Sequence, residues 1–161
     1  MSQTSFSVNS PAFSFEGQLA DSGENDVVSA LAEEAIPFGK FTVRGTDPAN
    51  QCLLPTLSTD ITSKLRHMGL ALHDQAREVT TGTAQYPIAS AVSCMKRGRA
   101  VVKVEESVVA GDGVYVRYAA GGLGLGSFRA SAGTSEAALL ADAVYLSAAS
   151  ANCFAVVEFN L

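Results

Sequence analysis

The most informative stretch of the chain covers residues 107–118 and reads Ser-Val-Val-Ala-Gly-Asp-Gly-Val-Tyr-Val-Arg-Tyr. Two β-branched runs flank a Gly-Asp-Gly turn, and this pattern predicts a β-hairpin. Other short apolar runs bounded by turn residues lie at 66–73, 91–95, 99–104, 127–130, 142–147 and 153–160. Short strands at this spacing predict an all-β chain, built as a sandwich, jelly roll or barrel.

The N-terminal half gives a mixed pattern. Val27, Leu31 and Ala35 recur every four residues, which predicts one short helix over 25–35 that ends before Pro37. Residues 40–44 alternate as a strand, and residues 51–57 predict an edge strand because Pro55 interrupts them. The basic segment 96–99 is interpreted as a turn between the strands 91–95 and 99–104.

The first 23 residues have the composition of an extended arm, rich in Ser, Gln, Asn and Gly. Phe6, Phe13 and Phe15 lie within it, and a disordered tail rarely carries three phenylalanines so close together. The rings are candidate anchors on a neighbouring molecule; alternatively, they tuck under the arm's own domain. The predicted organisation is an arm over 1–23 and a single β-rich domain over 24–161.

Composition points toward assembly and away from several other classes. Charged residues make up 17% of the 161 residues, against roughly 25% in an average soluble domain, so the protein has little charged surface to keep it monomeric. A monomer coated in uncharged polar residues is the alternative. The net charge of −5 argues against a nucleic-acid partner, and no apolar stretch is long enough to span a membrane. No secretory signal is evident, and three widely spaced cysteines predict folding in a reducing cytoplasm.

Charge is distributed unevenly along the chain. The first 39 residues contain six acidic residues, including Glu33 and Glu34, and no Lys or Arg. This acidic third predicts a docking surface for a basic partner, with a solvated loop as the alternative. Arg97, Arg99 and Lys103 share one face of the predicted strand and form a basic patch. This patch is either a contact for the acidic third of a neighbouring copy or an ordinary solvated face.

No catalytic constellation is evident. The Gly-rich segment 121–126 matches neither a dinucleotide fingerprint nor a P-loop, and no Gly-x-Ser-x-Gly nucleophile motif occurs. His67 and His73 lack diagnostic metal-ligand spacing, and adjacent Glu105 and Glu106 would point to opposite faces of a strand. The sequence therefore predicts no enzyme activity, cofactor or metal. A β-barrel hydrolase whose site is invisible in sequence, or a partner- or carbohydrate-binding β module, remains as an alternative; the absence of Trp weakens the carbohydrate hypothesis.

Several motifs occur in the same order as in one known family. They include Ala-Glu-Glu-Ala-Ile-Pro-Phe-Gly at 32–39, Lys-Arg-Gly-Arg at 96–99, Gly-Asp-Gly-Val-Tyr-Val-Arg at 111–117, Gly-Ser-Phe-Arg-Ala at 126–130 and the terminal Ala-Val-Val-Glu-Phe-Asn-Leu at 155–161. With them the chain resembles the structural cement proteins that decorate the capsids of tailed phages. The resemblance spans nearly the whole chain; 57–65 and 121–126 are not matched.

The resemblance implies a jelly-roll-like domain with an extended N-terminal arm and no enzyme activity or cofactor. It also implies a homodimer or homotrimer that binds the major capsid protein on the capsid exterior of the virion, after synthesis in the bacterial host cytoplasm. It makes Phe6, Phe13, Phe15, Glu33, Glu34, Arg97, Arg99 and Lys103 the candidate assembly contacts. Removal of residues 1–20 is expected to leave a folded β domain that decorates poorly.

Overall fold

The computed structural model describes residues 15–161 except 77 and 79–81. The chain is mainly β, as the sequence predicts. Its strands are β1 Asp26–Ala32, β2 Ile36–Pro37, β3 Phe41–Arg44, β4 Gln51–Leu53, β5 His67–Ala71, β6 Gln85–Tyr86, β7 Ala91–Lys103, β8 Gly113–Arg117, β9 Phe128–Arg129, β10 Ala137–Tyr145 and β11 Phe154–Asn160. Its short helices include α1 Ser58–Thr62 and the 3-10 helix η1 Lys64–Arg66. Neither of these has the length or apolar character needed to cross a membrane.

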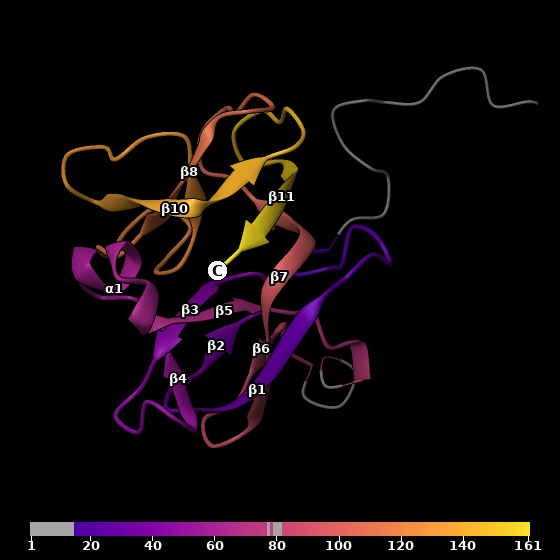
Figure 1. Ribbon diagram of the computed structural model, residues 1–161, viewed down its shortest axis with the longest axis vertical. Coiled ribbons are helices and arrows are strands. Elements are labelled where there is room, and N and C mark those ends of the chain that lie inside the picture. The colour runs from indigo at the N-terminus through magenta and orange to yellow at the C-terminus, as the bar shows by residue number, and fades with distance from the viewer. Residues whose placement is uncertain (1–14, 77, 79–81) are drawn as a thin grey trace, which may run out of the picture.

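Five strands close into a first ring in the lower half of Figure 1. Their pairing order is β1-β4-β3-β5-β7, and β7 pairs back onto β1. Small side chains belong to the core of this half, among them Ala30, Ala32, Cys52 and Cys94. The hydroxyl of Thr42, also buried, lies 3.5 Å from the sulfur of Cys94. Residues this small are what the narrow interior of a five-stranded ring can accommodate.

A second ring occupies the upper half of Figure 1 and shares β7 with the first. Its strands follow the order β7-β11-β10-β8-β9, and Phe128 of β9 bridges to Val104 just beyond β7. The main hydrophobic core includes Val102, Val116 and Leu140 of this ring together with Phe41 and Leu70 of the first. The long strand β7 therefore joins two rings that also share one core. Of the predicted alternatives, a sandwich, a jelly roll or a barrel, the two closed rings correspond to the barrel.

The prediction of a helix over 25–35 is wrong, because this segment forms β1. Six residue pairs join β1 antiparallel to β7. Ala30 and Ala32 are buried whereas Val27 and Leu31 are exposed, so burial alternates every second residue along the segment. Pairing along the full length of β1 outweighs the weak helical spacing that three apolar residues provide.

Two further expectations about strand connections are also wrong. Residues 96–99 do not form a turn: β7 continues through them with a bulge opposite Asp26 and Val27. Gly98 lies there at φ +133°, and a Cβ at this position would stand 2.0 Å from Oδ1 of Asn25. The segment 107–110 does not pair with β8; Val108 instead bridges Ala149.

The prediction that 51–57 forms an edge strand is wrong, because β4 lies between β1 and β3. A strand with two neighbours is possible here because β4 ends at Leu53 and Pro55 lies outside the ladder. The predicted strands 40–44, 66–73, 114–118, 127–130 and 153–160 are confirmed as β3, β5, β8, β9 and β11, with small differences at their ends. The predicted strand 142–147 is confirmed only in part, because β10 begins five residues earlier, at Ala137, and ends at Tyr145.

Residues 15–20 run along the edge of β7 beyond the end of β1. Gly17 N donates to Val101 O at 2.8 Å, Val101 N donates to Gln18 O at 2.8 Å, and Ala20 N donates to Arg99 O at 2.9 Å. His73 N donates to Gly17 O at 2.9 Å, so Gly17 joins β7 to the end of β5. Gly17 has φ +79°, and a Cβ there would lie 2.7 Å from Ala71 O. The last part of the predicted arm is therefore hydrogen-bonded into the domain.

Candidate functional site

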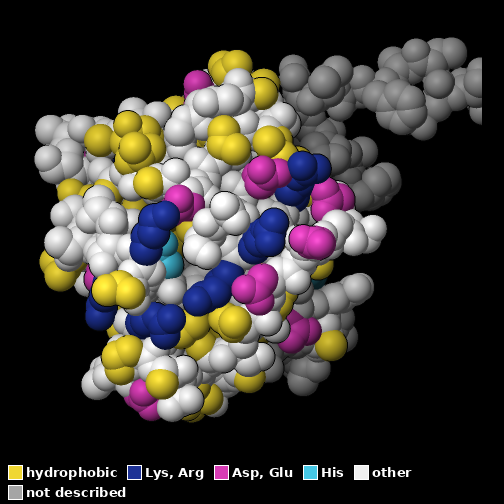
Figure 2. Space-filling model, viewed as in Figure 1, with side chains coloured by type: hydrophobic (Ala, Val, Ile, Leu, Met, Phe, Trp, Pro, Cys, Tyr) yellow, Lys and Arg dark blue, Asp and Glu magenta, His cyan; other side chains and the backbone are white. Residues whose placement is uncertain are grey.

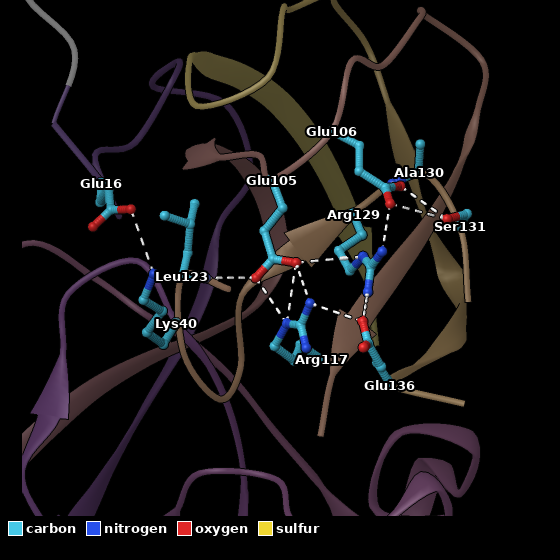
Figure 3. Close-up of polar contacts among 10 residues, drawn as sticks. All are labelled: Glu16, Lys40, Glu105, Glu106, Arg117, Leu123, Arg129, Ala130, Ser131 and Glu136. Carbon is cyan, nitrogen blue, oxygen red and sulfur yellow. Dashed lines mark hydrogen bonds and ion pairs between the residues drawn. The ribbon is translucent and has the colours of Figure 1, made fainter. Parts of the chain in front are cut away.

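A buried ion network ties three loop segments together (Figure 3). Arg117 donates from Nε to Glu105 Oε1 at 2.8 Å and from Nη2 to Glu105 Oε2 at 2.8 Å. Arg129 donates to Glu106 and, at 2.6 Å, to Glu136. The side chains of Glu105, Arg117 and Arg129 are each less than one-tenth exposed. Such charges are stable in the interior only when they are paired, and here each cation contacts two or three carboxylates.

The network organises surface loops. Glu105 accepts a hydrogen bond from Leu123 N at 2.8 Å, which fixes the Gly-rich segment 121–126. That segment crosses to the other ring, where Phe41 N donates to Gly126 O at 2.9 Å. Glu106 accepts from Ala130 N at 3.2 Å and from the Ser131 hydroxyl, which fixes the loop before β10. These contacts give the carboxylates a structural role.

The side chains of Glu105 and Glu106 do not point to opposite faces, as was expected of adjacent residues in a strand. Both lie beyond the end of β7, where strand alternation no longer applies, and both form an ion pair with Arg129. Their convergence shapes the network and leaves no free acid-base pair.

We expect the network to make the protein acid-labile. Burial alone would raise the pKa of Glu106, but hydrogen bonds from Arg129 and Ser131 outweigh it and hold that pKa below its ordinary value. The pKa of Glu136 is lowered mainly by its hydrogen bond from Arg129 and by the charge of Arg117. A carboxylate with a depressed folded-state pKa stabilises the fold above the unfolded pKa, about 4.3, and loses that contribution as pH falls through the folded value.

Acid titration followed by circular dichroism measures this effect. The wild type should hold its stability near neutral pH and lose it below about pH 4.3. Glu106→Gln should be less stable at pH 7 and should lose less stability as the pH falls below about 4.3, because residue 106 no longer titrates. If the variant lost stability with the same pH dependence as the wild type, Glu106 would not be a source of the acid lability. Glu24→Gln is the matched control, since the Glu24 side chain is 88% exposed.

A shallow groove brings part of the acidic third against the basic patch. This charged groove encloses about 380 Å³ and is lined by Asp21, Gly23, Glu24, Arg97, Gly98, Arg99, Glu158, Phe159 and Asn160. Arg99 donates to Glu158 at 2.7 Å and to Asp21 at 3.2 Å, while Arg97 lies 3.8 Å from Glu24. Two of the predicted contact residues, Arg97 and Arg99, thus meet acidic residues of their own chain.

The other predicted contact residues are scattered. Glu33 accepts hydrogen bonds from Thr46, and Glu34 accepts one from Leu54 N at 2.8 Å, so both hold loops beside β4. Lys103 is half-buried at the end of β7, on the strand that also carries the groove arginines.

The described part of the arm contributes one exposed aromatic ring. The ring of Phe15 is stacked on His73 with centroids 5.1 Å apart, and Phe15 is 55% exposed. Phe6 and Phe13 lie outside the described residues.

The two histidines have separate surroundings. His67 is buried with Nε2 2.6 Å from Ile61 O, whereas His73 Nε2 lies 2.8 Å from Glu78 Oε2. Within the described ranges, no group of three His, Cys, Asp or Glu side chains is placed to hold a metal ion. The three cysteines are free thiols, with Cys52 and Cys94 buried.

Sequence reasoning missed a concentration of cations on one face. Figure 2 shows Lys and Arg side chains in a band over the region where Figure 1 labels β3, β5 and β7. We call the set Arg44, Lys64, Arg66, Lys96 and Arg97 the basic face. Arg44 and Arg66 adjoin the paired residues Val43 and His67, Lys64 and Lys96 both lie within electrostatic range of His67, and Arg97 follows Lys96. They come from three different elements, β3, η1 and β7, so only the folded arrangement brings them together; the run Lys96-Arg97 was the available signal.

Comparison with known proteins identifies the family. A family model described as structural cement protein (E217 gp24/Pam3 gp6) matches residues 2–160. The chain belongs to this phage structural cement protein family. No curated protein matches it. A chain from the solved structure titled "The capsid of Myoviridae Phage XM1" shares 18% identity with a TM-score of 0.70, covering 89% of this chain and 88% of that chain.

Membership in the cement protein family confirms the resemblance found in the sequence. The chain is a structural protein of a phage capsid, and its family is not one of enzymes. The similarity to the XM1 chain, at 18% identity, supports the fold. The buried network and the charged groove are accordingly parts of a structural protein.

Proposed function

We propose that this cement protein binds the outside of the major capsid protein lattice and stabilises the mature phage head. Its family membership carries the proposal. The low charged fraction of 17% favours a protein that works in an assembly. On this proposal the chain is made in the bacterial host cytoplasm and acts as a homodimer or homotrimer on the capsid exterior.

The fold supports attachment through side chains and loops. Each ring closes on itself, so its strands have a hydrogen-bonded neighbour on both sides. The described strands of the rings therefore offer little open edge to which a partner could add a strand. Surface loops held by the ion network and the charged faces around β7 are therefore the available contact regions.

Stabilisation follows from linkage. A protein that binds only the mature shell adds its binding free energy to that shell, about 2.7 kcal/mol per site at a hundredfold excess over Kd. Many bound copies that bridge capsomers would raise the cost of opening the lattice under the pressure of packaged DNA.

Co-sedimentation with expanded empty capsids tests the proposal. We expect the protein to pellet with expanded shells, to raise the temperature at which they open, and to pellet far less with unexpanded precursor shells. Light scattering of the free protein should give a mass above that of the 16.7 kDa monomer. Absence of binding to expanded shells would refute the capsid role, while a monomer that still binds would refute only preassembly.

A further inference from the structure

The basic face carries more positive charge than its surroundings neutralise. Its five cations stand against three carboxylates that form ion pairs with it: Asp142 with Lys64 at 2.7 Å, Asp60 with Arg66 at 3.1 Å, and the more distant Glu24 with Arg97 at 3.8 Å. An excess of two positive charges therefore lies on one side of a chain whose net charge is −5. The molecule has a strong separation of charge.

Like charges are crowded on this face. Val43 pairs with His67, so Arg44, which follows Val43, and Arg66, which precedes His67, leave neighbouring points of the two antiparallel segments. Lys64 and Lys96 both lie close enough to His67 to act on its pKa, which burial lowers first. Lys64 and Arg66 each form an ion pair with one carboxylate and Arg44 donates to the Pro48 carbonyl, so this face lacks a network of carboxylates like the one around Arg117.

Two cations of the basic face, Arg97 and Lys64, are exposed enough to form further hydrogen bonds. Arg97 is 61% exposed at its side chain, and its ion-pair partner Glu24 is 3.8 Å away and 88% exposed. A charge-assisted hydrogen bond is about 2.7–2.9 Å long, so this pair leaves the guanidinium available to another carboxylate. Lys64 is 67% exposed despite its contact with Asp142.

We propose that the basic face docks onto an acidic protein surface of the capsid, with Lys96 and Arg97 near the centre of the contact. This inference rests on the proposed function and specifies the surface that performs it. Charge complementarity supports an acidic protein surface. Nucleic acid is disfavoured because the chain as a whole is acidic and three carboxylates form ion pairs with the face.

Charge reversal at one of two matched lysines tests the proposal. Lys96 and Lys103 are both half-buried and both lie on β7. Lys103 is a contact candidate from the sequence alone and lies outside the basic face, so the two variants set the sequence-based contact against the one that the fold indicates. Binding to expanded empty capsids lacking the protein is measured for full-length wild type, Lys96→Glu and Lys103→Glu at several salt concentrations. We expect Lys96→Glu to weaken binding about tenfold or more at low salt, and Lys103→Glu to change it less than about twofold.

Salt should weaken wild-type binding and reduce the difference between the variants, because screening shortens the Debye length from ~10 Å at 0.1 M to ~3 Å at 1 M. Equal capsid binding by wild type and Lys96→Glu, with both folded by circular dichroism, would overturn the inference and leave the cement function intact. Loss of self-association in sedimentation velocity with capsid binding unchanged would assign the face to a second copy and also overturn it. If wild type fails to bind capsids, the proposed function fails first and this inference with it.

Discussion

Replacing Arg117 with methionine is expected to lower the free energy of unfolding by about 3–5 kcal/mol, the usual cost of removing one partner from a buried ion pair. Methionine preserves much of the aliphatic volume, so the loss comes from the charge. Glu105, only 8% exposed at its side chain, would keep a buried negative charge with fewer donors. Chemical denaturation monitored by circular dichroism measures the change.

Two controls separate this mechanism from general damage. Arg97→Met removes the same kind of charge from an exposed position and should change stability by less than about 0.5 kcal/mol. Adding Glu105→Gln to Arg117→Met should recover part of the loss, because the amide oxygen still accepts from Leu123 N and no unpaired charge is buried. A double variant less stable than Arg117→Met would argue against charge burial as the cause.

The strands that the sequence predicted correctly are those whose local pattern and tertiary pairing agree. β8 and β11 are β-branched runs, and each is paired on both sides in the second ring. β1 was misread because its helical spacing is local, whereas its six pairs to β7 come from residues about 60–70 positions further along the chain. The Lys-Arg-Gly-Arg segment was misread because its glycine serves a bulge beside Asn25, a contact that no local pattern reveals.

The candidate sites, like the strands, could be predicted from the sequence only where their residues are close together along the chain. Arg97 and Arg99 were predicted because they are close in sequence, and they do lie together in the charged groove. The ion network was not predicted because Glu105, Arg117, Arg129 and Glu136 are separated by intervening loops. Adjacent Glu residues and two well-spaced arginines do not indicate a network until strand pairing places them together.

Truncation at two positions within the predicted arm is expected to give very different proteins. Removing residues 1–20 deletes the four backbone hydrogen bonds that Gly17, Gln18 and Ala20 make with β7 and His73. At about 0.5–1.5 kcal/mol each, their loss destabilises the domain by about 2–6 kcal/mol. This replaces the expectation from composition that a 1–20 deletion leaves the domain intact.

Removing residues 1–14 is the matched control, because it deletes none of these four bonds. We expect this shorter variant to melt within a few degrees of wild type, whereas the longer deletion melts well below it, since 1 kcal/mol shifts Tm by about 2–4 °C in a domain of this size. Val101, now only 4% exposed, should become exposed in the longer variant along with its unpaired backbone carbonyl. Equal melting temperatures for the two truncations would show that residues 15–20 add nothing to the stability of β7, and the boundary between arm and domain would then lie after Ala20, close to where composition alone puts it.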